Sequence, residues 1–214
     1  MFTLYTTPLS ANGRKPLALS HALGLEPEIR LVNVYAGEGR APAFLAVNPL
    51  GKVPALADGD FTLVESNAML VYIAEQYGGS RFWSAAPRAR AGILRWLFWE
   101  ASAWQPALST VLAACVGHRL LPNVVPAPTA PPDWKHPQLL PLLAFLDAEL
   151  ARSAFLCGNE LTIADFSVAG MTTYFRHAEF PSAAWPNIAA WLADRKSTRL
   201  NSSHVTTSRM PSSA

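Results

Sequence analysis

The chain has 214 residues, of which 50% are hydrophobic and 15% are charged, enough to bury a substantial core in one large domain or two small ones. Of the 17 basic residues three lie after residue 195, where no acid occurs, so 14 basic residues face 15 acidic ones in the rest of the chain. This balance argues against nucleic acid as a partner. No apolar run reaches the roughly 20 residues that span a membrane, and the strand-like beginning of the chain does not resemble a signal peptide.

The cysteines and histidines predict neither a disulfide framework nor a metal site. Cys115 and Cys157 have no redox or metal-ligand spacing. His118, His136 and His177 likewise have no partner at ligand spacing. We therefore expect a reduced, cytoplasmic protein without a bound metal.

The first 79 residues predict strands that alternate with helices. Asn12 offers an N-cap for the first helix and Gly24 a C-cap. Asp58-Gly59-Asp60 lies between two apolar runs, a pattern typical of a tight hairpin. The predicted strands are 2–6, 29–34, 53–57 and 61–64, and the second predicted helix is 66–77.

Strands 2–6 and 29–34 are joined by a helix, so we expect them to be parallel. The hairpin then adds an antiparallel edge. This order predicts a thioredoxin-like domain over residues 1–79, followed by a linker over 80–86.

Residues 87–195 predict an all-helical domain. Helical periods cover 87–121 and 137–195, with Pro106 bending or interrupting the first of them. Six prolines between 122 and 137 predict a loop, and a helix is expected over 139–150. Thr162 and Asp165 have the spacing of a capping box that starts a later helix.

Three segments are candidates for binding and chemistry, and the first is Val53-Pro54. A cis proline here would expose the amide and carbonyl of Val53 for an extended peptide to pair with. The alternative is a trans proline that opens an edge strand.

The second candidate is Glu65-Ser66, at the start of helix 66–77. The unsatisfied amides of a helix N-terminus and the Ser66 hydroxyl can hold a carboxylate, while Glu65 can pair with an ammonium group. Together they suit a free amino-acid end such as a γ-glutamyl group. The alternative is that Ser66 only caps the helix.

The third candidate is the turn with Ser10 and Asn12, between the first strand and the first helix. A thiol with a pKa near 8.5 is only a few per cent ionised at pH 7, and a hydroxyl beside a helix N-terminus would stabilise its thiolate. Lowering that pKa by about two units requires roughly 2.7 kcal/mol. The alternative is that Ser10 or Asn12 only caps the helix.

These segments occur together and in order with LGKVPAL at 50–56 and LTIAD at 161–165, and the set resembles the cytosolic glutathione transferases. Within this family, the chain resembles the serine-type members, the phi- or theta-like enzymes of plants and bacteria. The resemblance implies that Ser10 activates the glutathione thiol and that Val53 pairs with the cysteinyl backbone beside cis-Pro54. It also implies a homodimer, with the first domain of one subunit against the helices of the other; helix 66–77 and the tryptophan-rich helix predicted within 87–121 are candidate contributors. By the same resemblance Glu65 and Ser66 bind the γ-glutamyl group, and Arg40 and Lys52 are candidates for the glycine carboxylate.

The resemblance leaves some alternatives open. The turn is also similar to that of relatives that act on disulfides, which makes Asn12 a second candidate activator and disulfide reduction an alternative activity. A third reading is a transferase-like module that binds ligands or partners without turnover. Trp99, Trp104 and the loop 122–137 are candidates to line a pocket for an apolar electrophile, although aromatic residues at helical spacing more often belong to a core.

The last nineteen residues differ in character from the rest. Residues 196–214 are rich in serine and threonine and have no helical apolar period. They resemble translated sequencing-adapter DNA, so we expect an artefactual tail after a truncated helical domain; the alternative is a natural disordered terminus.

Overall fold

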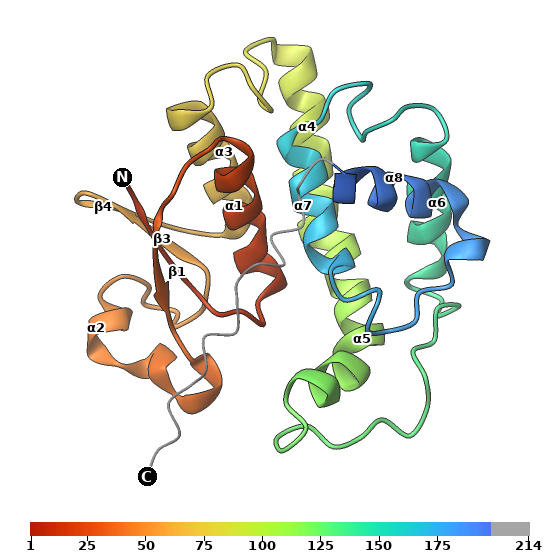
Figure 1. Cartoon of the computed structure of the whole chain (residues 1–214), viewed down its shortest axis with the longest axis horizontal. Helices are drawn as coiled ribbons and strands as arrows, with labels where there is room; N and C mark the ends of the chain where they lie inside the picture. The colour runs from red at the N-terminus through yellow and green to blue at the C-terminus, as the bar shows by residue number, and fades with distance from the viewer. Residues whose placement is uncertain (198–214) are drawn as a thin grey trace.

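The computed structural model describes residues 1–197 and has two parts, a mixed sheet with its helices and a bundle of helices (Figure 1). The sheet has the order β2-β1-β3-β4. β1 and β2 are parallel, whereas β3 is antiparallel to both β1 and β4, as predicted. The strands are β1 (Thr3–Thr6), β2 (Glu28–Leu31), β3 (Ala55–Asp58) and β4 (Phe61–Val64). The helices of this part are α1 (Ala11–Ala22), α2 (Pro42–Leu45) and α3 (Ser66–Tyr77), with 3-10 turns at Val34–Ala36 and Glu38–Arg40.

The second part is helical throughout its regular elements. The helices are α4 (Pro87–Trp99), α5 (Gln105–Leu120), α6 (Leu140–Leu150), α7 (Ile163–Thr172) and α8 (Pro186–Ser197), with a 3-10 turn at Ser182–Ala184. A thioredoxin-like domain followed by an all-helical domain is therefore the fold, as predicted. In the described residues no helix is long and apolar enough to cross a membrane. From residue 198 onward, the expected tail falls outside the described residues.

Several element boundaries differ from the prediction. α1 begins at Ala11 and is capped by Ser10, whose hydroxyl accepts from the amide of Gly13, so Asn12 lies inside the first turn instead of capping it. β2 covers Glu28–Leu31 and is shorter than the predicted strand 29–34, because its neighbour β1 has four residues with which it can pair. The chain then leaves the sheet, and a 3-10 turn begins at Val34.

Pro106 neither breaks nor ends the long helix. A π-helical segment, Glu100–Trp104, joins α4 to α5, and the amide of Gln105 donates to the carbonyl of Glu100 five residues earlier. Proline has no amide to donate and crowds the preceding turn, and the wider π turn accommodates it without ending the helix.

The two parts share one hydrophobic core. α1 and α3 cover one face of the sheet and pack against α7, which in turn packs against α4 (Figure 1). A smaller cluster around Phe44 of α2 covers the other face. The predicted capping box starts α7: the Thr162 amide donates to Asp165 at 3.0 Å. Asp165 also accepts from the indole of Trp191, so the box ties α7 to α8.

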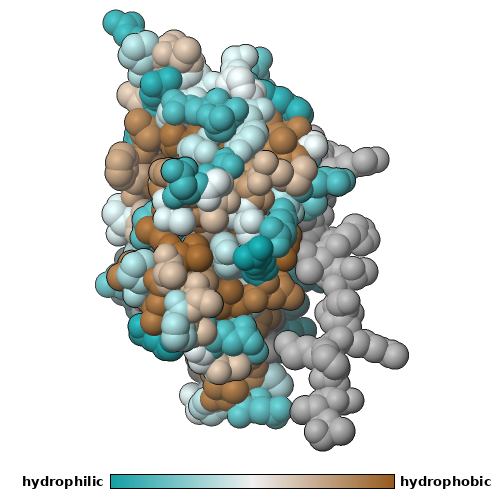
Figure 2. Space-filling model, turned by 90° about the vertical axis from the view of Figure 1, so that its left-hand side faces the viewer, coloured by the Kyte–Doolittle hydropathy of each residue, from teal (hydrophilic) through white to brown (hydrophobic). Residues whose placement is uncertain are grey.

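Large apolar side chains also reach the surface of the first domain. Leu31, Leu50 and Phe61 are all exposed. Figure 2, which views the molecule from the side of this domain, shows hydrophobic patches between hydrophilic ones. Apolar surface of this kind is a candidate for contact with a partner.

Candidate active site

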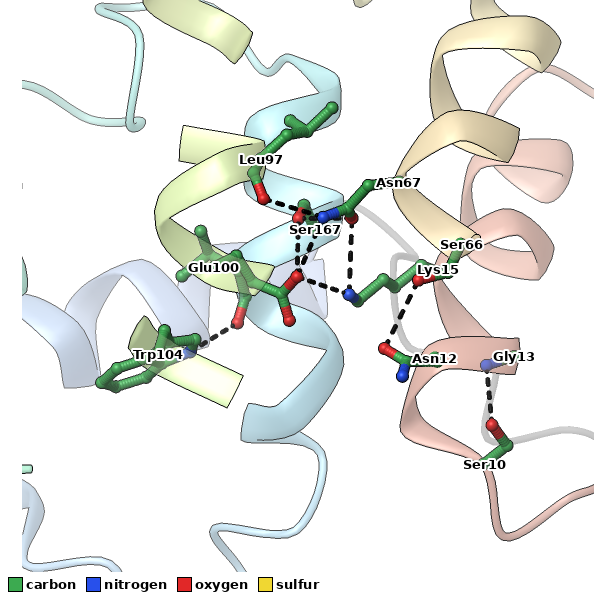
Figure 3. Close-up of polar contacts among 11 residues, drawn as sticks. Ser10, Asn12, Gly13, Lys15, Ser66, Asn67, Leu97, Glu100, Trp104 and Ser167 are labelled. Atoms are coloured by element: carbon green, nitrogen blue, oxygen red, sulfur yellow. Dashed lines mark hydrogen bonds and ion pairs between the residues drawn. The ribbon is translucent and has the colours of Figure 1, made fainter. Parts of the chain in front are cut away.

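The Ser10 side chain sits at the N-terminus of α1, just after the turn that leaves β1. Its Oγ accepts from the amide of Gly13 at 3.0 Å (Figure 3). A hydroxyl that accepts with a lone pair keeps its own proton for donation. The positive end of a twelve-residue helix lies beside it. This position therefore combines a hydrogen-bond donor with a field that favours an anion.

The N-termini of α1 and α3 lie side by side. Ser66 Oγ, in the first residue of α3, donates to Asn12 Oδ1 at 3.4 Å (Figure 3). Ser66 is buried, whereas the preceding Glu65 is exposed. Glu65 has φ of 69°, a value that costs free energy for a residue other than glycine. Such strain is concentrated at functional sites, and it here turns the chain abruptly into α3.

Arg40 and Lys52 come together through two glycines. A Cβ at Gly39 would lie 2.5 Å from the carbonyl oxygen of Gly51, so only glycines allow this approach of the two loops. The same approach places Arg40 Nη1 3.5 Å from a Cβ built at Gly51, next to Lys52. Both cationic side chains are exposed. One lies at the end of the 3-10 turn Glu38–Arg40 and the other on the loop that precedes β3, and the glycine contact makes these two loops neighbours.

The Val53–Pro54 peptide bond is cis, as the resemblance implied. It directly precedes β3, and Pro54 is buried. The carbonyl of the preceding residue, Lys52, accepts from the side-chain amide of Asn48 at 2.6 Å. This hydrogen bond fixes the loop on which Lys52 and Val53 lie.

A cavity of about 510 Å³ opens at the N-terminus of α3. It contains three of the predicted site residues, Asn12, Glu65 and Ser66. On its other side are residues of α4, the π segment and α5, namely Leu94, Leu97, Phe98, Glu100, Ala101, Gln105, Pro106 and Ser109. Ser10, Arg40, Lys52 and the Val53-Pro54 step are not among the residues that line it.

A buried polar network at the wall of the cavity escaped the sequence analysis. Lys15 and Glu100 form an ion pair at 2.8 Å, with side-chain exposures of 1% and 0%. Asn67 donates to Glu100 at 3.0 Å and accepts from Ser167 at 2.8 Å (Figure 3). Burial lowers the pKa of the Lys15 ammonium, against the attraction of Glu100.

This network holds α1, α3, α7 and the π segment together directly behind Ser66, because Asn67 is the next residue of α3. The available signal was Glu100 itself, a lone acid in the aromatic run from Trp96 to Trp104. A charged residue in an otherwise apolar helical stretch is buried only when it is paired. The sequence did not indicate which cation would pair with it.

Of the two tryptophans proposed for the electrophile pocket, Trp104 lies in the core and the partly buried Trp99 packs against it. Trp104 is fully buried and donates its indole N–H to the carbonyl of Val168. Trp99 stacks on Trp104 at 5.4 Å between ring centres and also contacts Phe145. Both therefore belong to the packing of the helical domain, which was the alternative interpretation of their spacing.

Sequence comparison identifies the family. Residues 1–75 match the family model "Glutathione S-transferase, N-terminal domain", and residues 133–194 match "Glutathione S-transferase, C-terminal domain". The chain is 36% identical to "Glutathione S-transferase 3" of Zea mays, over 88% of this chain and 86% of the relative. The chain belongs to the glutathione S-transferase family. It is also 33% identical to "Glutathione S-transferase F13" of Arabidopsis thaliana, over 89% of each chain.

Solved structures of glutathione transferases have the same fold. Glutathione transferase F7 from Populus trichocarpa aligns with a TM-score of 0.79 at 27% identity, over 94% of this chain and 95% of that one. A glutathione S-transferase from Pseudomonas fluorescens aligns with a TM-score of 0.79 at 27% identity, over 93% and 96%. Family and fold thus agree, and the chain is an enzyme of glutathione transfer, with glutathione as its substrate.

Proposed function

We propose that this transferase is of the serine type, with Ser10 donating a hydrogen bond to the thiolate of bound glutathione. The supporting observation is the position of Ser10 at the N-terminus of α1, where its Oγ accepts from Gly13 and keeps a proton for donation. One hydrogen bond to a charged group contributes about 1.5–3 kcal/mol. Together with a helix dipole this reaches the roughly 2.7 kcal/mol that a two-unit fall in thiol pKa requires.

Asn12 has a different role in this proposal. Its Oδ1 is already occupied by the hydroxyl of Ser66, so we assign it to the support of the γ-glutamyl subsite. Ser66 and the free amides of α3 would bind the α-carboxylate there, and Glu65 the ammonium group. At the other end, Arg40 and Lys52 would bind the glycine carboxylate, with the backbone of Val53, next to Pro54, pairing with the cysteinyl residue.

The protein contributes little to the reaction beyond stabilising the thiolate and holding the two reactants close together. The sulfur attacks an electrophilic carbon of an apolar substrate, a carbon–sulfur bond forms, and the leaving group departs with its electron pair. Holding both reactants side by side contributes the larger share of the rate.

The test is the pKa of the bound thiol, read from thiolate absorbance against pH. Ser10→Ala is expected to raise it by about one to two pH units and, through the smaller thiolate fraction, to lower kcat at pH 7 by roughly 3- to 25-fold. Asn12→Ala is the matched control and should weaken glutathione binding without that shift in pKa. A bound thiol of unchanged pKa in Ser10→Ala would refute the serine assignment.

We also propose a homodimer that uses the open cavity beside α3. One wall of the cavity is α4, where Phe98 is 70% exposed, and Leu50 on the loop before β3 is 58% exposed. Apolar side chains this exposed, one of them in the wall of the cavity, suit contact with a second copy. Light scattering should give twice the chain mass, and Phe98→Asp should give the monomer mass.

For the chain as a whole, we propose a binding domain over 1–79, a linker over 80–86 and a helical domain over 87–195. We further propose that 196–214 is foreign sequence, because its composition differs from that of the helices before it. Amplification of the locus from source DNA tests this: recovery of the same codons would show that the segment is genuine.

A further inference from the structure

The turn that carries Ser10 is held from the helical domain, by residues far away in sequence. The hydroxyl of Tyr174, just after α7, donates to the backbone carbonyl of Leu9. Arg14 donates through Nη2 to the carbonyl of Pro8 at 2.9 Å, and through Nη1 to Thr173 Oγ1 at 2.7 Å. Both carbonyls immediately before Ser10 therefore accept hydrogen bonds from side chains.

The two donors also contact each other. The guanidinium carbon of Arg14 lies 5.3 Å from the centre of the Tyr174 ring, within the range of a cation–π interaction. Arg14 lies one helical turn after Ser10 in α1, while Tyr174 lies 165 residues from Leu9. The turn is thus fixed between its own helix and the end of α7.

The chemistry of these side chains determines which group donates and which accepts in each hydrogen bond. Tyr174 is only 8% exposed, and burial raises the pKa of its hydroxyl, so it stays protonated and donates at neutral pH. Thr173 in turn donates to the carbonyl of Gly170 at 2.8 Å, which leaves its oxygen lone pairs to accept from Arg14. Tyr174 and Arg14 are thus the donors to the turn, and Thr173 anchors Arg14 by accepting from it while donating to Gly170.

We propose that Tyr174 and Arg14 are positioning residues that hold the Pro8–Ser10 turn, so that the Ser10 hydroxyl points at the glutathione sulfur. This inference rests on the proposed role of Ser10. A hydrogen bond weakens steeply with misalignment, and displacements of about 1 Å at a catalytic group cost large factors in rate. In this way, residues of the helical domain control how well Ser10, in the first domain, stabilises the thiolate of glutathione.

The proposal separates thiol activation from glutathione binding. The side-chain hydrogen bonds of Tyr174 and Arg14 go to Pro8, Leu9 and Thr173, and not to the residues assigned to the two ends of glutathione. Loosening the turn should therefore raise the thiol pKa and lower kcat while the Kd for glutathione stays nearly constant. A general loss of structure would weaken both.

The experiment compares Tyr174→Phe and Arg14→Lys with the wild-type enzyme. The first removes only a hydroxyl, and the second keeps the charge but loses the planar fork that reaches two acceptors. Tyr72→Phe is the matched control, because Tyr72 donates to Asp58, at the end of β3, at 2.8 Å and has no hydrogen bond to the turn. For each protein we would measure the bound-thiol pKa, the Kd for glutathione by calorimetry, and kcat against pH.

Each clamp variant is expected to raise the bound-thiol pKa by about 0.5–1 unit, which lowers the thiolate fraction near pH 6.5 roughly two- to five-fold for a wild-type bound thiol with a pKa near 6.5. The Kd should change less than about two-fold, and kcat should recover at high pH. In a Ser10→Ala background the same substitutions should produce no further shift. Tyr72→Phe should behave as wild type in all three measurements.

The outcomes separate the two ideas. If Ser10→Ala raises the thiol pKa but neither clamp variant does, the clamp is refuted and the role of Ser10 stands. If Ser10→Ala has no effect, the serine assignment fails and the clamp fails with it. A clamp variant that still shifts the pKa in the Ser10→Ala background would also overturn the proposal, because it would then act on the thiol without Ser10.

Discussion

Removing the ammonium of Lys15 tests the energetics of the polar network behind the site. Lys15→Met keeps most of the stem that packs on Gly170 but leaves the Glu100 carboxylate, fully buried, without its counter-ion. Glu100 Oε1 already has no hydrogen-bond partner in the described part of the chain. Breaking one side of a buried pair costs about 3–5 kcal/mol, so we expect a loss of that size in the free energy of unfolding.

Neutralising both partners should lower the free energy of unfolding much less. In Lys15→Met/Glu100→Gln no uncompensated charge remains, and replacement of a whole buried pair is often close to neutral. We expect the double variant to lose less than roughly 2 kcal/mol, so that the double-mutant cycle shows a coupling of at least about 1 kcal/mol.

Urea unfolding is the assay, with the slope m checked for constancy so that a shifted midpoint reports stability. Arg30→Met is the control, because the Arg30–Glu28 pair is equally short at 2.8 Å but has side-chain exposures of 55%; its loss should leave the midpoint unchanged within error. A loss below about 1 kcal/mol in Lys15→Met would refute the reasoning, since the pair would then behave like a surface pair.

Three further predictions concern packing, capping and pH. Gly170→Ala places a Cβ 2.8 Å from the Cε of buried Lys15, so we expect a loss of about 1–3 kcal/mol in urea unfolding. Asp165→Ala removes the capping-box acceptor that also serves an indole of α8, and a loss of roughly 3 kcal/mol or more is expected by the same assay. Two tyrosine hydroxyls hold the pKa of Asp58 below its ordinary value, so its carboxylate stabilises the fold above the unfolded-state pKa and this contribution disappears as pH falls through the folded-state pKa. Asp58→Asn should therefore lower the thermal midpoint at neutral pH, and the difference from wild type should vanish in acid.

Local sequence signals were sufficient to predict the bounds of several elements that position the site. β4 and α3 have the predicted bounds, because a tight Asp-Gly turn fixes the hairpin and helical spacing of apolar residues fixes the helix that follows. Thr162 and Asp165 form the predicted capping box, since all of its hydrogen bonds lie within four residues. Ser10, by contrast, replaces Asn12 as the cap of α1, because two side chains three residues or less apart compete for the same amides and local pattern does not rank them.

What only the tertiary structure decided are the contacts between distant segments. Lys15 meets Glu100, 85 residues away, and Tyr174 meets Leu9, 165 residues away; no spacing rule relates such pairs. The wide π turn before Pro106 and the glycine contact that brings Arg40 to Lys52 also depend on the packing around them. The sequence by itself therefore determined the order of elements, the family and the candidate residues. Packing of α1 against α7 determined how the serine turn is held, because the energy of a buried hydrogen bond or ion pair depends on what surrounds it and not on its place in the chain.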